Sequence, residues 1–283
     1  MKKSIEREAF AKVNLTLEVL GKRADGYHSI RSVVQQISLH DTVIVEESDD
    51  FSSDSAFPDD LAVKAARLLA SVACVKKGAF IKIVKRIPVG GGLGGGSADA
   101  AAALLALNEL WGLGWSLERL VNVARQVGSD VPALVLGGTV LMEGRGEIVA
   151  PLFPENTQSE KINLVLVNPG IFCSTKDVYA KCNFRLQETP SILYNMRTAL
   201  ELCDVHAVAS AMMNDLQAPA FSLHPEIESA LKALVNAGVE GAMMSGSGST
   251  VFGLVPNEAD GRKIADEMKK RGFWAECVHT IVR

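Results

Sequence analysis

Residues 88–104 read PVGGGLGGGSADAAAAL, a stretch that places six glycines within the seven positions from Gly90 to Gly96. The residues before it, KGAFIKIVKRIPV, alternate as a strand does, and the alanine-rich segment that begins at Ser97 predicts a helix. Because each glycine costs backbone entropy in a strand or helix, the six glycines indicate a loop without β-carbons, whose N–H groups can point at one anion. The loop leads into the positive end of the helix, so the sequence predicts a phosphate site. A flexible linker is the alternative, but a linker is rarely flanked so closely by a strand and a helix.

The glycine loop fits none of three common nucleotide-binding patterns. A P-loop has a Lys directly after its last glycine, and Ser97 stands there instead. Gly90, Gly92 and Gly95 have the G-x-G-x-x-G spacing, but a dinucleotide fold would place a strand after the helix. The segment that follows, LGWSLERLVNVARQVG, predicts a second helix instead, with Ser116 as its N-cap. The H-R-D and D-F-G motifs of protein kinases are absent from the sequence.

The rest of the chain predicts an α+β fold in two lobes. Residues 11–20 (AKVNLTLEVL) alternate apolar and polar side chains as a half-buried strand does, and residues 32–48 predict two more strands separated by His40 and Asp41. Strands and helices mix without a regular β–α alternation. Pro151, Pro154 and the polar residues 156–159 indicate a boundary that divides the chain into domains 1–153 and 154–283.

Charged residues close to the loop receive structural interpretations. Asp99 is predicted to cap the helix, because a carboxylate in the first turn complements the helix dipole. Lys82, Lys85 and Arg86 are predicted to form the solvated face of the preceding strand, with assistance in phosphate binding as the alternative.

The composition excludes several classes of protein. With 48% hydrophobic and 22% charged residues over 283 positions, the chain is neither disordered nor collagen-like. A net charge of −4 provides no general attraction to nucleic acid or membrane, so we expect neither as a partner. Five scattered cysteines without a C-x-x-C pair predict reduced thiols and a cytoplasmic protein. The uncharged run 131–142 is interrupted by proline and glycine and is too short to span a membrane, and residues 6–8 are charged where a signal peptide would be apolar.

Four motifs together resemble the GHMP kinases, a family that includes galactokinase and the homoserine and mevalonate kinases. They are AKVNLTLEVLGKRADGYHSI, PVGGGLGGGSADAA, GSDVP and SGSGSTVFGL, which start at residues 11, 88, 128 and 245. The resemblance covers nearly the whole chain and implies a two-lobed kinase that phosphorylates a small-molecule alcohol, with the active site between the lobes. It implies that ATP binds along Pro88, Val89, Gly90, Gly91, Gly92, Leu93, Gly94, Gly95, Gly96, Ser97 and Ala98. Mg²⁺ is expected on the phosphates of ATP, since the sequence has no clustered carboxylates for a protein metal site.

Phosphoryl transfer needs an anion loop, a cation and a carboxylate that orients the nucleophilic hydroxyl. Asp130, in the loop GSDVP, is the candidate carboxylate, with a helix N-cap as the structural alternative. Lys12, at the start of the first predicted strand, is the candidate cation by the resemblance; on local sequence alone it is an ordinary surface lysine. The resemblance implies that the two pair and that both are catalytic.

The resemblance also implies a substrate that carries a cytidyl diphosphate. Tyr27 is expected to stack on the cytosine, His28 to hydrogen-bond its edge, and Tyr179 to close the other face. Asn14 is expected on the same strand face as Lys12, contacting the substrate or packed as a buried polar residue, and Thr175 is expected near the ribose or diphosphate. The small residues 245–249 form either an ordinary hairpin turn or a surface that approaches the phosphates or the glycine loop. Two alternatives stay open: another GHMP kinase with a different alcohol substrate, and a non-catalytic nucleotide- or RNA-binding protein of this fold.

Overall fold

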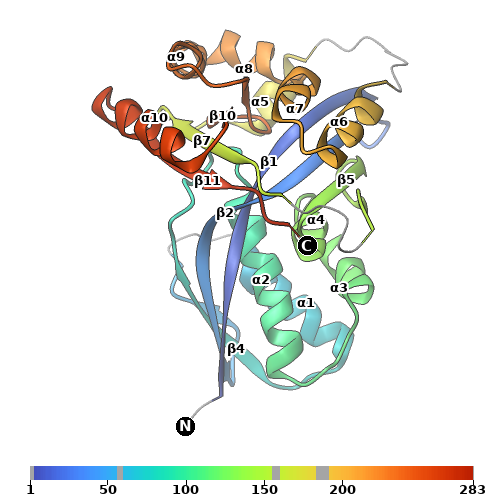
Figure 1. The fold of residues 1–283 in the computed structure, drawn as a ribbon. Coiled ribbons are helices and arrows are strands. Elements are labelled where there is room, and N and C mark those ends of the chain that lie inside the picture. The colour runs from blue at the N-terminus through green and yellow to red at the C-terminus, as the bar shows by residue number, and fades with distance from the viewer. Residues whose placement is uncertain (1–2, 56–59, 155–159, 183–190, 283) are drawn as a thin grey trace.

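The computed structural model describes residues 3–55, 60–154, 160–182 and 191–282, and these residues form two mainly antiparallel sheets with helices packed against them. The mixture of helices and strands confirms the α+β prediction. In Figure 1 the helices of the first half of the chain lie in the lower part of the molecule and those of the second half in the upper part. None of the described helices is long and apolar enough to cross a membrane.

The first sheet is built around one long pair of antiparallel strands. β1 (Ser4–Lys22) and β2 (His28–Ser48) pair along nearly their whole length, and β1 contains the strand predicted at residues 11–20. The prediction of two strands separated at His40 and Asp41 was wrong, because β2 continues through both residues, which pair with Phe10 and Ala9 of β1. Asp41 is tolerated inside a strand because its buried carboxylate has hydrogen-bond donors and an ammonium partner, described below.

Five shorter strands complete this sheet. The order is β3-β4-β2-β1-β8, and β5 pairs with β2 and with β6. Their bounds are β3 (Ser52–Ser53), β4 (Gly78–Val84), β5 (Thr139–Gly144), β6 (Ile148–Pro151) and β8 (Met213–Asn214).

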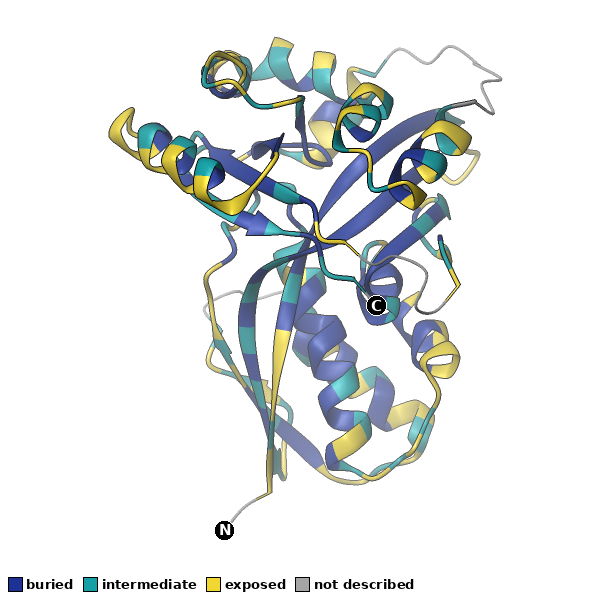
Figure 2. Ribbon diagram, viewed as in Figure 1, coloured by how far each residue is buried: buried dark blue, intermediate teal, exposed yellow. Residues whose placement is uncertain are grey.

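Helix α2 (Gly95–Leu110) lies against β1 and β2 and forms the centre of the first half. Ten of its residues, mostly alanines, are buried, and Figure 2 shows the dark blue of buried residues where α2 meets the sheet. Alanine favours the helix and its small side chain permits close packing. The helix begins at Gly95, two residues before the predicted start, with Gly94 as its N-cap. The other helices here are α1 (Leu61–Ala73), α3 (Leu117–Ala124) and α4 (Val131–Leu136).

The second sheet has the strand order β11-β7-β10-β9 and is covered by helices of the second half. Its strands are β7 (Asn163–Asn168), β9 (Ala242–Met244), β10 (Val251–Val255) and β11 (Trp274–His279). The helices are α5 (Thr175–Ala180), α6 (Ser191–Glu201), α7 (Val205–Ala211), α8 (Gln217–Leu223), α9 (Pro225–Asn236) and α10 (Glu258–Lys270). The outward face of α10 is exposed, as its yellow stripe in Figure 2 shows.

Strand pairing and the C-terminal segment help to join the halves. β8 comes from the second half of the chain but pairs in parallel with β1 of the first sheet. After β11 the chain returns to β2, where Thr280 bridges Ile37 and the side chain of Gln35 donates to the carbonyl of Ile281. The division into domains 1–153 and 154–283 stays a prediction, and the polar residues 156–159 that mark it lie outside the described residues.

Candidate active site

The glycine loop connects β4 to α2 and is fixed by backbone hydrogen bonds from two distant segments. The N–H of Lys12 on β1 donates to the carbonyl of Leu93 at 3.0 Å, and the N–H of Thr250 donates to the carbonyl of Gly91 at 3.0 Å. Gly90, Gly92 and Gly94 have φ values of 69°, 76° and 71°. Residues with side chains rarely adopt this conformation, so the alternating glycines are required by the path of the loop.

The third motif, residues 245–249, packs directly on this loop. Ser245 donates a hydrogen bond from its hydroxyl to the carbonyl of Gly92 at 3.0 Å. A β-carbon at Gly92 would lie 2.8 Å from the carbonyl oxygen of Gly248. Of the two interpretations of the motif, the structure thus shows a turn that approaches the glycine loop.

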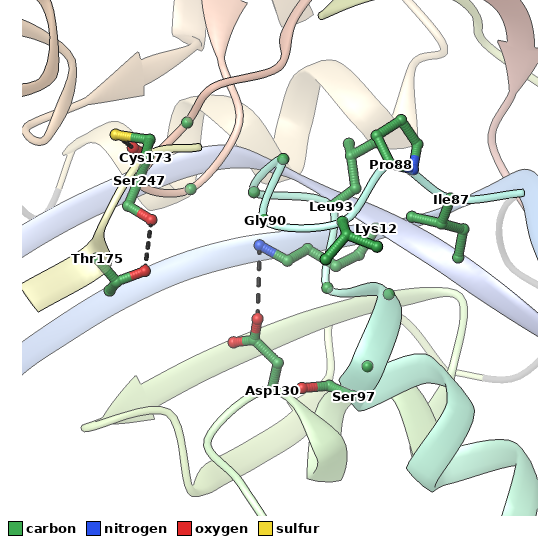
Figure 3. A pocket seen from close by; sticks show the side chains of 18 of the residues that line it. Lys12, Ile87, Pro88, Gly90, Leu93, Ser97, Asp130, Cys173, Thr175 and Ser247 are labelled. Atoms are coloured by element: carbon green, nitrogen blue, oxygen red, sulfur yellow. Dashed lines mark hydrogen bonds and ion pairs between the residues drawn. The ribbon is translucent and has the colours of Figure 1, made fainter. Parts of the chain in front are cut away.

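A cavity of about 850 Å³ lies along the loop and is lined by residues from both halves of the chain. Its walls include the glycine loop, the start of α2, the region around Asp60 before α1, and the turn around Ser247. Figure 3 shows Lys12 and Asp130 below the loop, with Thr175 and Ser247 to their left. The volume is in the range of ligand-binding clefts.

Lys12 and Asp130, the predicted catalytic pair, meet in this cavity. The Lys12 ammonium lies 3.6 Å from a carboxylate oxygen of Asp130, and the side chains are 5% and 33% exposed. Asp130 occupies the N-cap position of α4, but its side chain makes no capping hydrogen bond. The carboxylate therefore faces Lys12 and the cavity rather than serving the helix (Figure 3).

The glycines of two motifs make room for Lys12. A β-carbon at Gly94 would lie 3.1 Å from the Lys12 side chain, and one at Gly246 would lie 3.2 Å from its ammonium nitrogen. Asn14 accepts a hydrogen bond from that ammonium at 2.6 Å and donates one to Ser32 at 2.8 Å. Asn14 is 1% exposed, so its amide orients Lys12 from within the core.

The predicted substrate residues are only partly brought together. Thr175 and Tyr179 line the cavity, and the Thr175 hydroxyl lies 2.8 Å from that of Ser247. The ring of Tyr179 stacks on His28 with centroids 5.0 Å apart and planes 16° from parallel. Tyr27 lies apart from this stack, 53% exposed, with the Arg145 guanidinium 5.1 Å from its ring centroid.

The pKa values of both groups in the Tyr179–His28 stack are shifted by their surroundings. Burial, followed by the charge of Asp130, raises the pKa of the Tyr179 hydroxyl, so this group stays neutral. Burial, with Lys22 nearby, lowers the pKa of His28, which favours the neutral imidazole at pH 7.

The sequence interpretation missed a second charged cluster beside the loop. Lys82, Lys85 and Arg86 are exposed, as predicted, but the ammonium of Lys85 also bridges the carboxylates of Asp41 and Asp99. Asp99 does not cap α2 as predicted: it is 5% exposed and pairs with Lys85 at 2.7 Å. An available signal was Asp41 itself, a carboxylate within an apolar alternating strand, which requires a cation or several N–H donors.

Phe172 was also missed. Its side chain is 71% exposed at the cavity mouth, and a β-carbon at Gly90 would lie 2.6 Å from its ring. The absence of a side chain at Gly90 thus permits the second half of the chain to contact the loop.

A glycine-rich anion loop, a lysine–aspartate pair and a large shared cavity are the features of a small-molecule phosphotransferase. The model of the GHMP kinases N terminal domain matches residues 60–138, and that of the GHMP kinases C terminal domain matches residues 196–273. The chain belongs to the GHMP kinase family.

Individual relatives have more specific names. A 4-diphosphocytidyl-2-C-methyl-D-erythritol kinase of Pelotomaculum thermopropionicum is 41% identical over 93% of both chains, and one of Thermodesulfovibrio yellowstonii is 35% identical over 97% of both. A crystal structure of a 4-(cytidine 5'-diphospho)-2C-methyl-D-erythritol kinase superposes with a TM-score of 0.82 at 33% identity, covering 98% of this chain and 99% of that one. Homoserine kinase from Cytophaga hutchinsonii, at 20% identity and a TM-score of 0.78 over 100% of this chain and 96% of that one, shares the fold.

Proposed function

We propose that the protein transfers the γ-phosphate of ATP to the 2-hydroxyl of 4-diphosphocytidyl-2-C-methyl-D-erythritol, which yields the 2-phosphate and ADP. The names of the relatives support this substrate. The observation that carries the reaction type is the Lys12–Asp130 pair, which faces the glycine loop within one cavity. The reaction belongs to the non-mevalonate pathway to isoprenoid precursors, and we place it in the cytoplasm.

Residues 88–98 form the proposed nucleotide site. Several backbone N–H groups of the loop and the N-terminal end of α2 provide positive potential for the phosphates. The buried Lys12 ammonium stabilises charge that develops on the phosphoryl group or on the attacking oxygen. Asp130 orients the substrate hydroxyl and accepts its proton late in the transfer.

Mg²⁺ would be held mainly by the phosphates and by water. Among the described residues no cluster of three metal-ligating side chains occurs. The two cavity carboxylates nearest the loop, Asp130 and Asp99, already pair with lysines. This donor set fits an ion that arrives with ATP, and such an ion supplies neutralisation of phosphate charge.

The cytidyl end of the substrate is assigned to the part of the cavity lined by Thr175 and Tyr179 and to the turn that precedes His28. Tyr179 and His28 form an aromatic surface on which cytosine can stack, and Tyr27 lies in the turn that precedes His28. Thr175 offers a hydroxyl for the ribose or diphosphate. Asn14 contributes indirectly, since its amide is engaged by Lys12 and Ser32.

A coupled ADP-release assay tests the proposal with three acceptors. We expect turnover with 4-diphosphocytidyl-2-C-methyl-D-erythritol and none with mevalonate or homoserine, and phosphorus NMR of the product should show a new phosphate monoester. Turnover with another acceptor only would indicate a different GHMP kinase. No ADP release with any acceptor, despite binding of an ATP analogue, would indicate a non-catalytic nucleotide-binding protein.

A further inference from the structure

Three charged side chains from separate elements meet beside the glycine loop. Asp41 comes from β2, Lys85 directly follows β4, and Asp99 belongs to α2. The ammonium of Lys85 contacts both carboxylates, with 2.7 Å to Asp99. The two carboxylate side chains are 0% and 7% exposed, and that of Lys85 is 29% exposed. Because both carboxylates are buried, these charge-assisted hydrogen bonds are stronger than ion pairs between exposed side chains.

Asp41 fixes the entry to the loop. One carboxylate oxygen contacts Lys85, and the other accepts hydrogen bonds from the backbone N–H groups of Arg86 and Ile87, the latter at 2.8 Å. These are the two residues directly before Pro88, so the end of the strand is tied to β2 at the point where the loop begins.

Asp99 fixes the exit from the loop. It lies one turn into α2, and Lys85 reaches it past the first residue of that helix: a β-carbon at Gly95 would lie 3.4 Å from the Lys85 nitrogen. One ammonium thus joins the residues before the loop to the helix after it. The other carboxylate oxygen of Asp99 has no hydrogen-bond partner among the described residues, so its hydrogen bond to Lys85 is the contact that links this carboxyl group to the residues before the loop.

The charges of the cluster distinguish Lys85 from Lys12. Both lysines line the cavity, but Lys85 contacts two carboxylates, whereas Lys12 lies 3.6 Å from one. The ammonium of Lys85 is already held by hydrogen bonds to two carboxyl groups, so the contribution that we infer for it is geometric.

We propose that Lys85, together with Asp41 and Asp99, is a positioning residue that holds the two ends of the glycine loop at a fixed separation, so that the loop N–H groups converge on the nucleotide phosphates. This inference rests on the proposed nucleotide site but not on the identity of the acceptor. Lys85 lines the cavity, and the role inferred for it is exerted through the loop and α2.

Hydrogen exchange in the protein without nucleotide tests the geometric claim. We expect Lys85→Met to accelerate amide exchange in residues 88–99 about tenfold, while β10 is unchanged, because the loop loses the link between its ends. Lys82→Met is the matched control: this exposed lysine lies on β4, three residues before Lys85, and should leave exchange in the loop as it is. Unchanged loop exchange in Lys85→Met would overturn the proposal, since a lysine that acts only by contacting phosphate has no effect before nucleotide binds.

Titration with a non-hydrolysable ATP analogue and Mg²⁺ tests the consequence for binding. We expect Lys85→Met to raise the dissociation constant about tenfold and Lys85→Arg, which keeps the cation, to restore most of the affinity. Asp99→Asn preserves side-chain size, and we expect faster loop exchange in this variant as well. Faster exchange with an unchanged dissociation constant would overturn the role in binding. Both measurements are independent of the acceptor, so a failure of the ADP-release assay leaves them interpretable.

Discussion

The hydroxyl of Ser245 donates a hydrogen bond to the carbonyl of Gly92 at 3.0 Å, and so joins two glycine-rich motifs that are 153 residues apart in the chain. The backbones of the two motifs lie close together, and the N–H of Thr250 donates a second hydrogen bond to the loop, at the carbonyl of Gly91. Side chains on either motif would separate them. The cavity between the halves therefore depends on glycine at the point of contact.

We expect Gly92→Ala to destabilise the protein and abolish nucleotide binding. The new β-carbon would collide with the carbonyls of Ser245 and Gly248, and φ at this position is 76°. Overpacking and backbone strain each cost about 1–3 kcal/mol, so a loss of about 3 kcal/mol in unfolding free energy is expected. Denaturant unfolding and titration with an ATP analogue measure both effects.

Gly112→Ala is the matched control for that variant. Gly112 has a similar φ of 63°, but nothing lies within 4 Å of the position that a β-carbon would take there. Conformational strain alone should cost about 1 kcal/mol and leave nucleotide binding intact. Equal effects of the two substitutions would show that the contact between the motifs contributes nothing.

We expect Lys12→Met and Asp130→Asn each to lower kcat by about 10²- to 10⁴-fold, because one removes the cation and the other the proton acceptor. Binding of an ATP analogue to Asp130→Asn should change little, because the loop and α2 are untouched. Steady-state kinetics and calorimetric titration separate the two properties. Near-normal kcat in either variant would contradict the assignment of that residue, and Lys82→Met serves as the control for loss of a lysine.

The glycine loop and the Lys12–Asp130 pair could both be predicted from the sequence, but for different reasons. Six clustered glycines have a local physical meaning, and the loop does precede a helix as predicted. The pairing of Lys12 with Asp130 followed only from the family resemblance, since nothing local distinguishes Lys12 from a surface lysine. The structure then shows why it is buried: Asn14 and the glycines at 94 and 246 surround it.

The Asp41–Lys85–Asp99 cluster escaped prediction because its members come from three elements. β4 ends at Val84, so Lys85 lies just beyond the strand, where the alternation of side chains no longer predicts the direction in which its side chain points. Asp99 was interpreted from its position in a helix turn, and its actual partner lies 14 residues earlier. Likewise, β2 passes through Asp41 without a break only because the distant Arg86 and Ile87 supply N–H donors.

We expect Tyr179→Leu to raise KM for the cytidyl substrate about 5- to 150-fold, because stacking on a base contributes about 1–3 kcal/mol. KM for ATP should stay the same, since the ring of Tyr179 stacks on His28. Tyr194→Leu is the control, an exposed tyrosine on α6. Equal KM values for the cytidyl substrate in the wild type and Tyr179→Leu would contradict the placement of cytosine at this ring.

Asp99 also predicts how stability depends on pH. Burial, opposed by Lys85, raises the pKa of Asp99 from 3.8 to about 7. The folded state therefore binds this proton more tightly than the unfolded state, and the resulting stabilisation is complete below pH 4 and is lost as the pH rises to about 7. At 1.36 kcal/mol per pKa unit, the upper bound is about 4 kcal/mol. We expect the difference in unfolding free energy between the wild type and Asp99→Asn to shift against the wild type over this interval. Other carboxylates titrate in both proteins and cancel in the difference, so parallel stability curves from pH 4 to pH 7 would contradict the raised pKa.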